Sequence, residues 1–298
     1  MKTLQIISLI VAATLFACRP GGSNEAEYSV KFSEETLEAE PFDTVEILSG
    51  FVVELKKSDK YSVEVKYPAH FDNFLIQEIS GNKLKLGFET TTELNDSVNG
   101  FDSGEVYQFL IQNKPTAVIS TPSPKYIRLM GGSELNFGEG FTADDCTVEM
   151  RRASVISGGS LNARHLAVTM DDASDCKMNI SADSAEVSLR GSASFRPAIY
   201  ARSLTVDMAE SCSAAMTKLI DKRGDYFRLD ISGSSMLDSG EIPFGKIEVK
   251  ASGASEAVVH PARMLFVDAS DESAVRYIFT KMLVKEIREN DNASVRIE

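Results

Sequence analysis

The chain has 298 residues, and its 44 Asp and Glu against 31 Lys and Arg give a formal net charge of −13 at pH 7. Apolar residues make up 43% of the chain, an ordinary fraction for a globular protein, which excludes a largely disordered chain. No block of Lys and Arg is present to bind phosphates, so we expect no nucleic-acid partner. Three His and no Trp leave little material for a His-rich metal site or a Trp platform that stacks on sugars.

Residues 1–17 are predicted to be a signal peptide rather than part of the fold. Lys2 precedes an uncharged apolar stretch that is too short to span a bilayer comfortably as a helix. The stretch ends in LFAC at residues 15–18, the pattern of a bacterial lipobox, in which the cysteine thiol receives a diacylglycerol. An ordinary secretory signal followed by an incidental cysteine is the alternative.

Residues 18–27 are predicted to form a lipidated tether, because their Pro, Gly and polar side chains cannot build a core. The acyl chains on Cys18 would hold the protein at a membrane. We therefore expect a lipid-anchored protein of the bacterial cell envelope, in the outer membrane, with the choice between its periplasmic and outer face left open.

Residues 28–126 carry strand signals and are predicted to form a β region that caps the next segment. A loop or short helical turn is expected at residues 68–71 and a polar insertion at residues 90–104. The predicted strands alternate or run apolar and are separated by turn residues. They lie at residues 42–51, 52–56, 61–67, 74–79, 83–88 and 106–111.

From Ile127 to residue 298 the sequence repeats with a period of about 20 residues. Small residues mark the units at Ser133, Ser154, Ser174, Ala193, Cys212, Ser235, Ser255, Ser273 and Ala293. Of the 27 positions that lie six and four residues before these anchors or two after them, 26 are apolar, the exception being Glu289. These even spacings are typical of strands, in which alternate side chains share one face.

A corner is predicted two residues before each anchor, where Gly and Asp recur and tolerate the dihedral angles of a bend. Units this short cannot bury an apolar face alone, but stacking them in register about 4.8 Å apart creates a continuous core. The sequence therefore predicts an all-β fold, a right-handed parallel β-helix of about nine coils over residues 127–298 with the N-terminal β cap. The same register places Arg151, Asp171 and Arg190 in one column, where opposite charges face each other on neighbouring strands.

Several segments resemble one known family. FDTVEILSGFVVEL at residues 42–55, YSVEV at 61–65, GNKLKL at 81–86 and AVISTPSPKYIRLMGGS at 117–133 are similar to the family described as "putative auto-transporter adhesin, head GIN domain". The resemblance covers residues 40–297. It implies a β-helical, secreted or lipid-anchored protein of Gram-negative bacteria with an adhesion role, and it brings no catalytic signature.

Acidic clusters are the strongest candidates for chemistry. Asp271 and Asp291 occupy the corner column on adjacent coils, about 5 Å apart if the register holds. Such a surface pair could bind Ca²⁺ or share a proton, and Asp171, Asp172 and Asp175 form a similar cluster. The alternative interpretation, which we favour, is that these aspartates stabilise bends and face water.

No other pattern indicates catalysis, so we expect no catalytic residues, metal ligands or cofactor. His165 and His260 fall in different units with no associated Ser or Cys nucleophile. Cys146, Cys176 and Cys212 lack a CxxC pair and are predicted to be small core residues.

We predict a non-enzymatic, lipid-anchored envelope adhesin that binds a glycan or an extracellular protein such as matrix. The alternatives are a carbohydrate-active enzyme, a polysaccharide lyase or hydrolase, on the same scaffold and an envelope scaffold with no external ligand.

Overall fold

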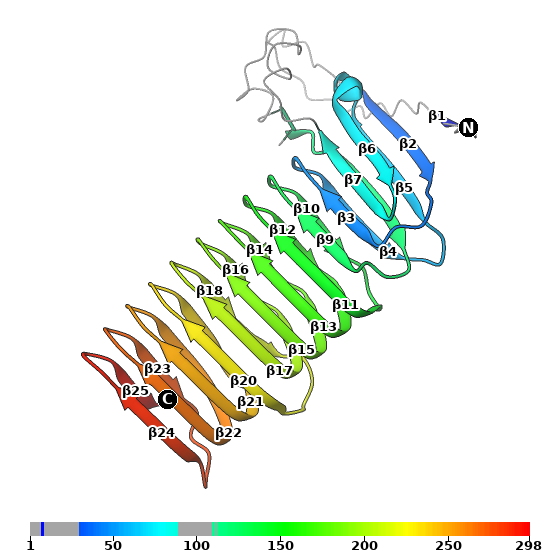
Figure 1. Cartoon of the computed structure of the whole chain (residues 1–298). Coiled ribbons are helices and arrows are strands. Elements are labelled where there is room, and N and C mark those ends of the chain that lie inside the picture. The colour runs from blue at the N-terminus through cyan, green and yellow to red at the C-terminus, as the bar shows by residue number, and fades with distance from the viewer. Residues whose placement is uncertain (1–6, 9–29, 89–108, 111) are drawn as a thin grey trace, which may run out of the picture.

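The computed structural model describes residues 7–8, 30–88, 109–110 and 112–298. The predictions for Cys18, for the tether at 18–27 and for the insertion at 90–104 lie outside the described residues. Within them the chain is almost entirely β structure, coiled into an elongated stack with β9 to β25 following one another along it (Figure 1). This arrangement confirms the predicted fold class.

The described residues of the N-terminal part include eight strands and one 3₁₀ helix. These elements are β1 (Ile7–Ser8), β2 (Phe32–Glu38), β3 (Thr44–Ile47), β4 (Val52–Lys57), β5 (Ser62–Pro68), η1 (Ala69–Phe74), β6 (Leu75–Ser80), β7 (Lys83–Phe88) and β8 (Thr116–Thr121). Of the strand predicted at 106–111, Phe109 and Leu110 are described, and they are helical.

The remaining strands build the stack. They are β9 (Tyr126–Leu129), β10 (Glu134–Phe137), β11 (Phe141–Met150), β12 (Val155–Gly158), β13 (Ser160–Met170), β14 (Asp175–Cys176), β15 (Asn179–Leu189), β16 (Ser194–Phe195), β17 (Ala198–Met208), β18 (Ser213–Ala215), β19 (Thr217–Lys218), β20 (Gly224–Ile231), β21 (Met236–Ala251), β22 (Glu256–Ala269), β23 (Ala274–Tyr277), β24 (Val284–Glu289) and β25 (Ser294–Ile297).

Each coil presents two main faces, which we call face 1 and face 2. Face 1 consists of the segments in register with β9, and face 2 consists of those in register with β10. Every pairing between successive coils on both faces is parallel. The columns predicted from even spacing are confirmed residue by residue, as in the run Val148, Val168, Val187 and Val206 on face 1.

The backbone at the corners between face 1 and face 2 adopts the left-handed conformation, with positive φ, as the column of Gly and Asp predicts. All nine residues at this position have positive φ: Gly131, Arg152, Asp172, Gly191, Glu210, Gly233, Gly253, Asp271 and Asp291. A non-glycine residue pays a steric penalty in this conformation, which is smallest for Asp and Asn.

The anchor residues are small because they point into the core beside each corner. The Oγ of Ser174 donates to the carbonyl oxygen of Asp171 at 2.8 Å, and the Oγ of Ser273 donates to that of Ser270 at 2.7 Å. Both serines are fully buried, so these bonds satisfy polar groups that water cannot reach. At the serine anchors the side chain therefore serves hydrogen bonding as well as close packing.

The parallel stack begins before residue 127. β3 pairs in parallel with β9 and β4 with β10, so residues 44–57 form a further coil. β7 and β8 continue both faces in parallel, and antiparallel strands follow them: β6 beside β7, and β5 and then β2 beside β8. The region expected only to cap the helix therefore contributes coils as well as antiparallel strands, of which β2 was not predicted.

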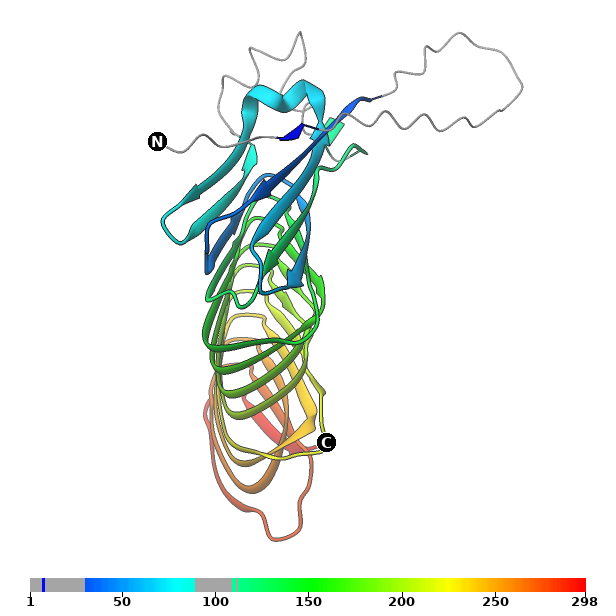
Figure 2. The same ribbon diagram turned by 90° about the vertical axis from the view of Figure 1, so that its right-hand side faces the viewer.

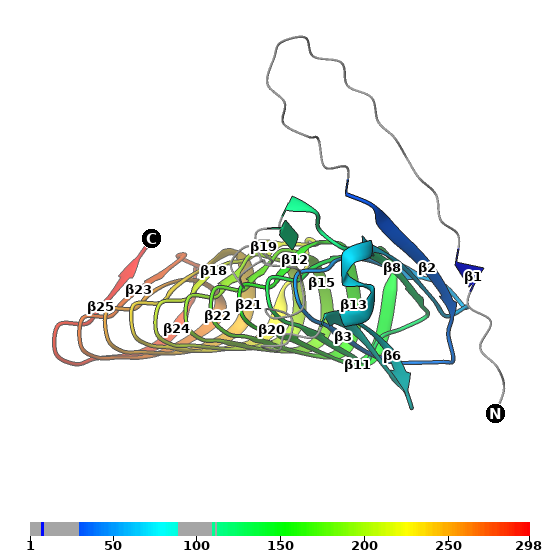
Figure 3. The same ribbon diagram turned by 90° about the horizontal axis from the view of Figure 1, so that it is seen from above.

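The two ends of the stack differ. At the N-terminal end η1 crosses the top of the stack, as Figure 2 shows, while the hairpin of β6 and β7 continues face 1. Phe71 on η1 is buried, and its ring centroid lies 5.5 Å from that of Phe88. At the opposite end the stack finishes on β24 and β25, near the C-terminus (Figure 3).

Candidate functional site

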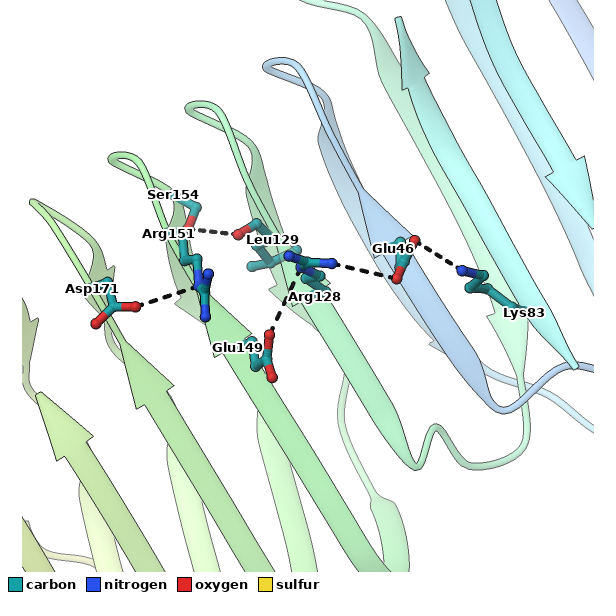
Figure 4. A network of polar contacts seen from close by, with 8 residues as sticks. All are labelled: Glu46, Lys83, Arg128, Leu129, Glu149, Arg151, Ser154 and Asp171. Carbon is teal, nitrogen blue, oxygen red and sulfur yellow. Dashed lines mark hydrogen bonds and ion pairs between the residues drawn. The ribbon is translucent and has the colours of Figure 1, made fainter. Parts of the chain in front are cut away.

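The outward side of face 1 is the candidate functional surface, because register brings polar side chains from many coils into straight columns on it. In the N-terminal half these side chains form an ion-pair network (Figure 4). Glu46 on β3 lies 3.4 Å from the Nζ of Lys83 and 3.8 Å from a guanidinium nitrogen of Arg128, which in turn lies 3.8 Å from Glu149. Cross-strand pairs of this kind contribute about 0.2 to 1 kcal/mol each, so they specify register more than they add stability.

In the C-terminal half the same face carries a shallow depression of about 440 Å³ over β20, β21, β22 and β24. Its lining combines one aromatic ring with charges of both signs. These side chains are Phe266, Arg228, Lys250, Arg288, Glu248 and Glu286. The depression is open rather than enclosed, which suits a ligand that lies along the surface.

A compact cluster adjoins this depression and shares Glu248 and Phe266 with its lining. The Nζ of Lys246 lies 2.5 Å from Glu248 and stands 5.6 Å and 5.1 Å from the ring centroids of Tyr226 and Phe266. The hydroxyl of Tyr226 donates to Glu248 at 2.6 Å. The pKa of Glu248 is lowered by its hydrogen bond with Lys246 and, to a smaller extent, by that with Tyr226. The pKa of Tyr226 is raised by burial and, to a smaller extent, by its hydrogen bond to Glu248.

These shifts favour the ionised form of Glu248 and the protonated form of Tyr226. Glu248 is ionised at neutral pH, whereas a glycosidase acid needs a carboxyl group whose pKa is raised. Tyr226 stays protonated and donates to Glu248. The arrangement offers fixed hydrogen-bonding groups and an aromatic surface, which are features of a binding site.

A second depression of about 370 Å³ lies at the corners of five successive coils. Its lining includes Arg151, Arg152, Arg190, Asp172 and Glu210. The charges partly neutralise one another: Arg151 pairs with Asp171 at 3.4 Å, as the column predicts, whereas Arg190 pairs with Asp207 at 2.8 Å.

Asp271 and Asp291 lie in the predicted column on successive coils. An oxygen of Asp271 accepts from the backbone N–H of Gly253 at 2.9 Å, and one of Asp291 accepts from that of Asp271 at 3.5 Å. Each carboxylate thus binds the corner of the preceding coil. No group of three or more His, Cys, Asp or Glu in the described part of the chain could hold a metal ion.

The cluster of Asp171, Asp172 and Asp175 is divided among separate contacts. Asp172 accepts from the backbone N–H of Arg152 at 3.3 Å, and Asp175 pairs with Arg196. His165 on β13 and His260 on β22 lie on strands that do not pair. The Nδ1 of His260 is 3.0 Å from the carbonyl oxygen of Gly240.

The three described cysteines are free and buried, in agreement with their predicted place in the core. Burial raises the pKa of Cys146 and of Cys176 to about 12, and it also raises that of Cys212. Thiols in this state are weak nucleophiles at neutral pH.

Sequence reasoning missed the cluster around Lys246. Its residues occupy odd offsets from the anchors, which the periodicity assigns to the solvent side without distinguishing them. The available signal was Phe266, a large aromatic residue one position before the inward Val267. An aromatic residue in an outward column identifies a place where apolar surface meets water.

An all-β stack of parallel coils with inward aliphatic columns and a polar outer face defines a parallel β-helix repeat protein. The family model described as "putative auto-transporter adhesin, head GIN domain" matches residues 41–196 and 171–278. The chain belongs to this family, as the resemblance in its sequence indicates.

Solved structures share the fold at low sequence identity. A crystal structure described as a putative adhesin from Parabacteroides merdae has a TM-score of 0.62 at 12% identity, covering 90% of this chain and 96% of that one. One described in the same words from Parabacteroides distasonis has a TM-score of 0.61 at 14% identity, covering 90% and 98%. A third, described as a putative lipid binding protein from the same species, has a TM-score of 0.56 at 14% identity, covering 90% and 96%.

No curated protein matches the chain. Among the described residues, no helix is long and apolar enough to cross a membrane. Membership of an adhesin-like family indicates a protein of the cell envelope or cell surface.

Proposed function

We propose that the protein is a non-enzymatic, lipid-anchored adhesin of the bacterial outer membrane that binds a glycan or an extracellular protein on the outward side of face 1. The observation that carries this proposal is the depression lined by Phe266 and by alternating charges. An aromatic ring can pack against an apolar sugar face, and fixed charged groups can hydrogen-bond the surrounding hydroxyls.

The C-terminal location of the depression supports this function. A lipid on Cys18 would attach the N-terminal end to the membrane, and the depression lies over β20 to β24, near the opposite end of the stack (Figure 1). The stack would then act as a spacer that carries the binding surface away from the lipid.

A glycan array followed by calorimetry on the best ligand tests the binding. Phe266→Ala is expected to weaken affinity at least tenfold, since it removes the aromatic surface. Thr147→Ala, at the same outward position on β11, is the matched control and is expected to bind like the wild type. Equal affinity of all three proteins would place the ligand elsewhere.

Reducing-end assays test the enzymatic alternative. We expect no turnover of polysaccharides by the purified chain. Turnover that disappears in Asp271→Asn would refute the non-enzymatic proposal.

The anchor is tested independently by metabolic labelling with a fatty-acid probe in wild type and Cys18→Ala. Labelling is expected only in the wild type, and unchanged labelling of the variant would refute lipidation at Cys18. Protease shaving of intact cells then distinguishes the two faces of the membrane.

A further inference from the structure

The C-terminal end of the stack presents two open strand edges. Among the described residues, β24 pairs only with β22 and β25 only with β23 (Figure 1). No strand of the described part of the chain lies beside the outer edge of either strand, so both edges present backbone N–H and C=O groups. Such edges are templates for pairing with a further chain.

Exposed apolar side chains gather at the same end. Phe279, Met282, Val284 and Ile297 are each more than half exposed, and all follow β23 in the chain. Ile287 occupies the inward column next to Val267 but is only half-buried in the structure. An apolar cluster of this kind marks an interaction surface.

Two charged residues on β24 limit what can cover this end. Lys285 and Glu289 stand in inward columns, in register with the buried Leu265 and Ala269. Lys285 donates to the hydroxyl of Tyr277 at 2.8 Å, and Glu289 accepts from the backbone N–H of Val295. Among the described residues neither has an ion-pair partner, so a strand that laid apolar side chains over them would bury two charges without counter-charges, which is costly. A suitable partner must therefore place an anion opposite Lys285 and a cation opposite Glu289.

We propose that two copies of this chain associate through β24, antiparallel about a two-fold axis at Ile287. In this register Lys285 faces Glu289 of the second copy. Glu286, which pairs with Arg288 of its own chain at 2.8 Å, faces Arg288 of the second copy and can exchange one partner for the other. The two-fold axis repeats both pairs. Ile287 meets Ile287 on the core side, so the inward charges are neutralised around an apolar centre.

The register follows from the sequence of the strand. The residue on a two-fold axis meets its own copy, so any charged residue there would face a like charge. Only Val284 and Ile287 on β24 are uncharged. Centring on Val284 would leave most of the strand without a partner, which leaves Ile287 as the centre.

This association is closed. A two-fold contact uses the same surface on both copies, so it produces a dimer rather than a filament. In each copy the depression on face 1 extends to β24, where Glu286 and Arg288 line it. The dimer would therefore bring the depressions of the two copies together across the axis.

Cysteine cross-linking tests the register in the full chain carrying Cys18→Ser. Opposite residues in an antiparallel pair have Cα atoms about 4.5 to 5.5 Å apart, within the range of a disulfide. Ile287→Cys is expected to form a disulfide-linked dimer under mild oxidation. Arg288→Cys alone is the control and is expected to stay monomeric in denaturing electrophoresis, but to cross-link when mixed with Glu286→Cys.

Charge exchange tests the pairing without cysteines. Sedimentation equilibrium is expected to show a dimer that Glu286→Arg weakens about tenfold or more, because two like-charge pairs replace two ion pairs. Adding Arg288→Glu in the same chain is expected to restore the dimer. A wild-type monomer at every concentration, a double variant that is not restored, or equal cross-linking by Ile287→Cys and Arg288→Cys would overturn the proposal.

Discussion

Gly159, which immediately precedes β13, lies where two successive coils approach each other closely, so its replacement tests this approach. Its φ is +97°, and a Cβ added there would lie 1.2 Å from the carbonyl oxygen of Phe137, although real Cβ contacts stay beyond 3.0 Å. Gly159→Ala must therefore shift the backbone of one coil by about 2 Å. Left-handed strain costs about 1 to 2 kcal/mol and overpacking about 1 to 3 kcal/mol, so we expect a loss of about 2 to 5 kcal/mol.

Gly132→Ala separates the two contributions. Its φ is +72°, but an added Cβ would meet nothing within 4 Å. We expect this control to lose only the strain contribution of about 1 to 2 kcal/mol. Urea unfolding followed by circular dichroism gives the free energy of unfolding of both variants and of the wild type. The values can be compared when the dependence of this free energy on urea concentration is the same for all three proteins. Equal losses in the two variants would refute the close approach of coils at Gly159.

Three further predictions concern a core side chain, the ion pair of Asp43 with Lys125, and the buried thiols. Phe227→Ala, which empties a fully buried site, is expected to reduce the free energy of unfolding by about 3 to 5 kcal/mol in the same assay. A hydrogen bond from Lys125, 2.8 Å away, lowers the pKa of Asp43 below its ordinary 3.8. The ionised carboxylate therefore contributes its full stabilisation above that pH, and the contribution is lost as the pH falls through the lowered pKa. Asp43→Asn is expected to be less stable than the wild type at neutral pH, and the difference in the free energy of unfolding is expected to shrink as the pH is lowered. Cys146 and Cys176, whose pKa values are about 12, are expected to resist a thiol reagent at pH 8 until denaturant is added.

Most of the stack could be predicted from sequence because its core obeys a simple spacing rule. Val148, Val168 and Val187 lie an even number of residues from their anchors, and the structure pairs them directly. The positive φ of Asp172 and Gly191 likewise follows from residue types that tolerate a left-handed corner.

The start of the stack was hidden for a physical reason. Val53 belongs to the same inward column as Leu135, but residues 58–125 separate its coil from the next one along face 2. Its anchor position is filled by Phe51, a large side chain where the later coils have small residues. Neither the period nor the residue size therefore identified residues 44–57 as a coil.

The depression on face 1 depends on information that spacing does not contain. Outward residues obey no size rule, and the partner of each charge depends on rotamers. Arg190 illustrates this limit, since it shares a column with Asp171 but makes its ion pair with Asp207.

The pairing of each coil with its immediate neighbours has a consequence for how such proteins change over time. Duplicating or deleting one unit of about 20 residues would lengthen or shorten the molecule by about 4.8 Å while leaving every other coil with equivalent neighbours. The length of the stack could thus evolve separately from the outward surface of any one coil. Because only inward columns and corners are constrained, sequences could diverge to the 12% to 14% identity seen with the solved structures while the coils still superimpose.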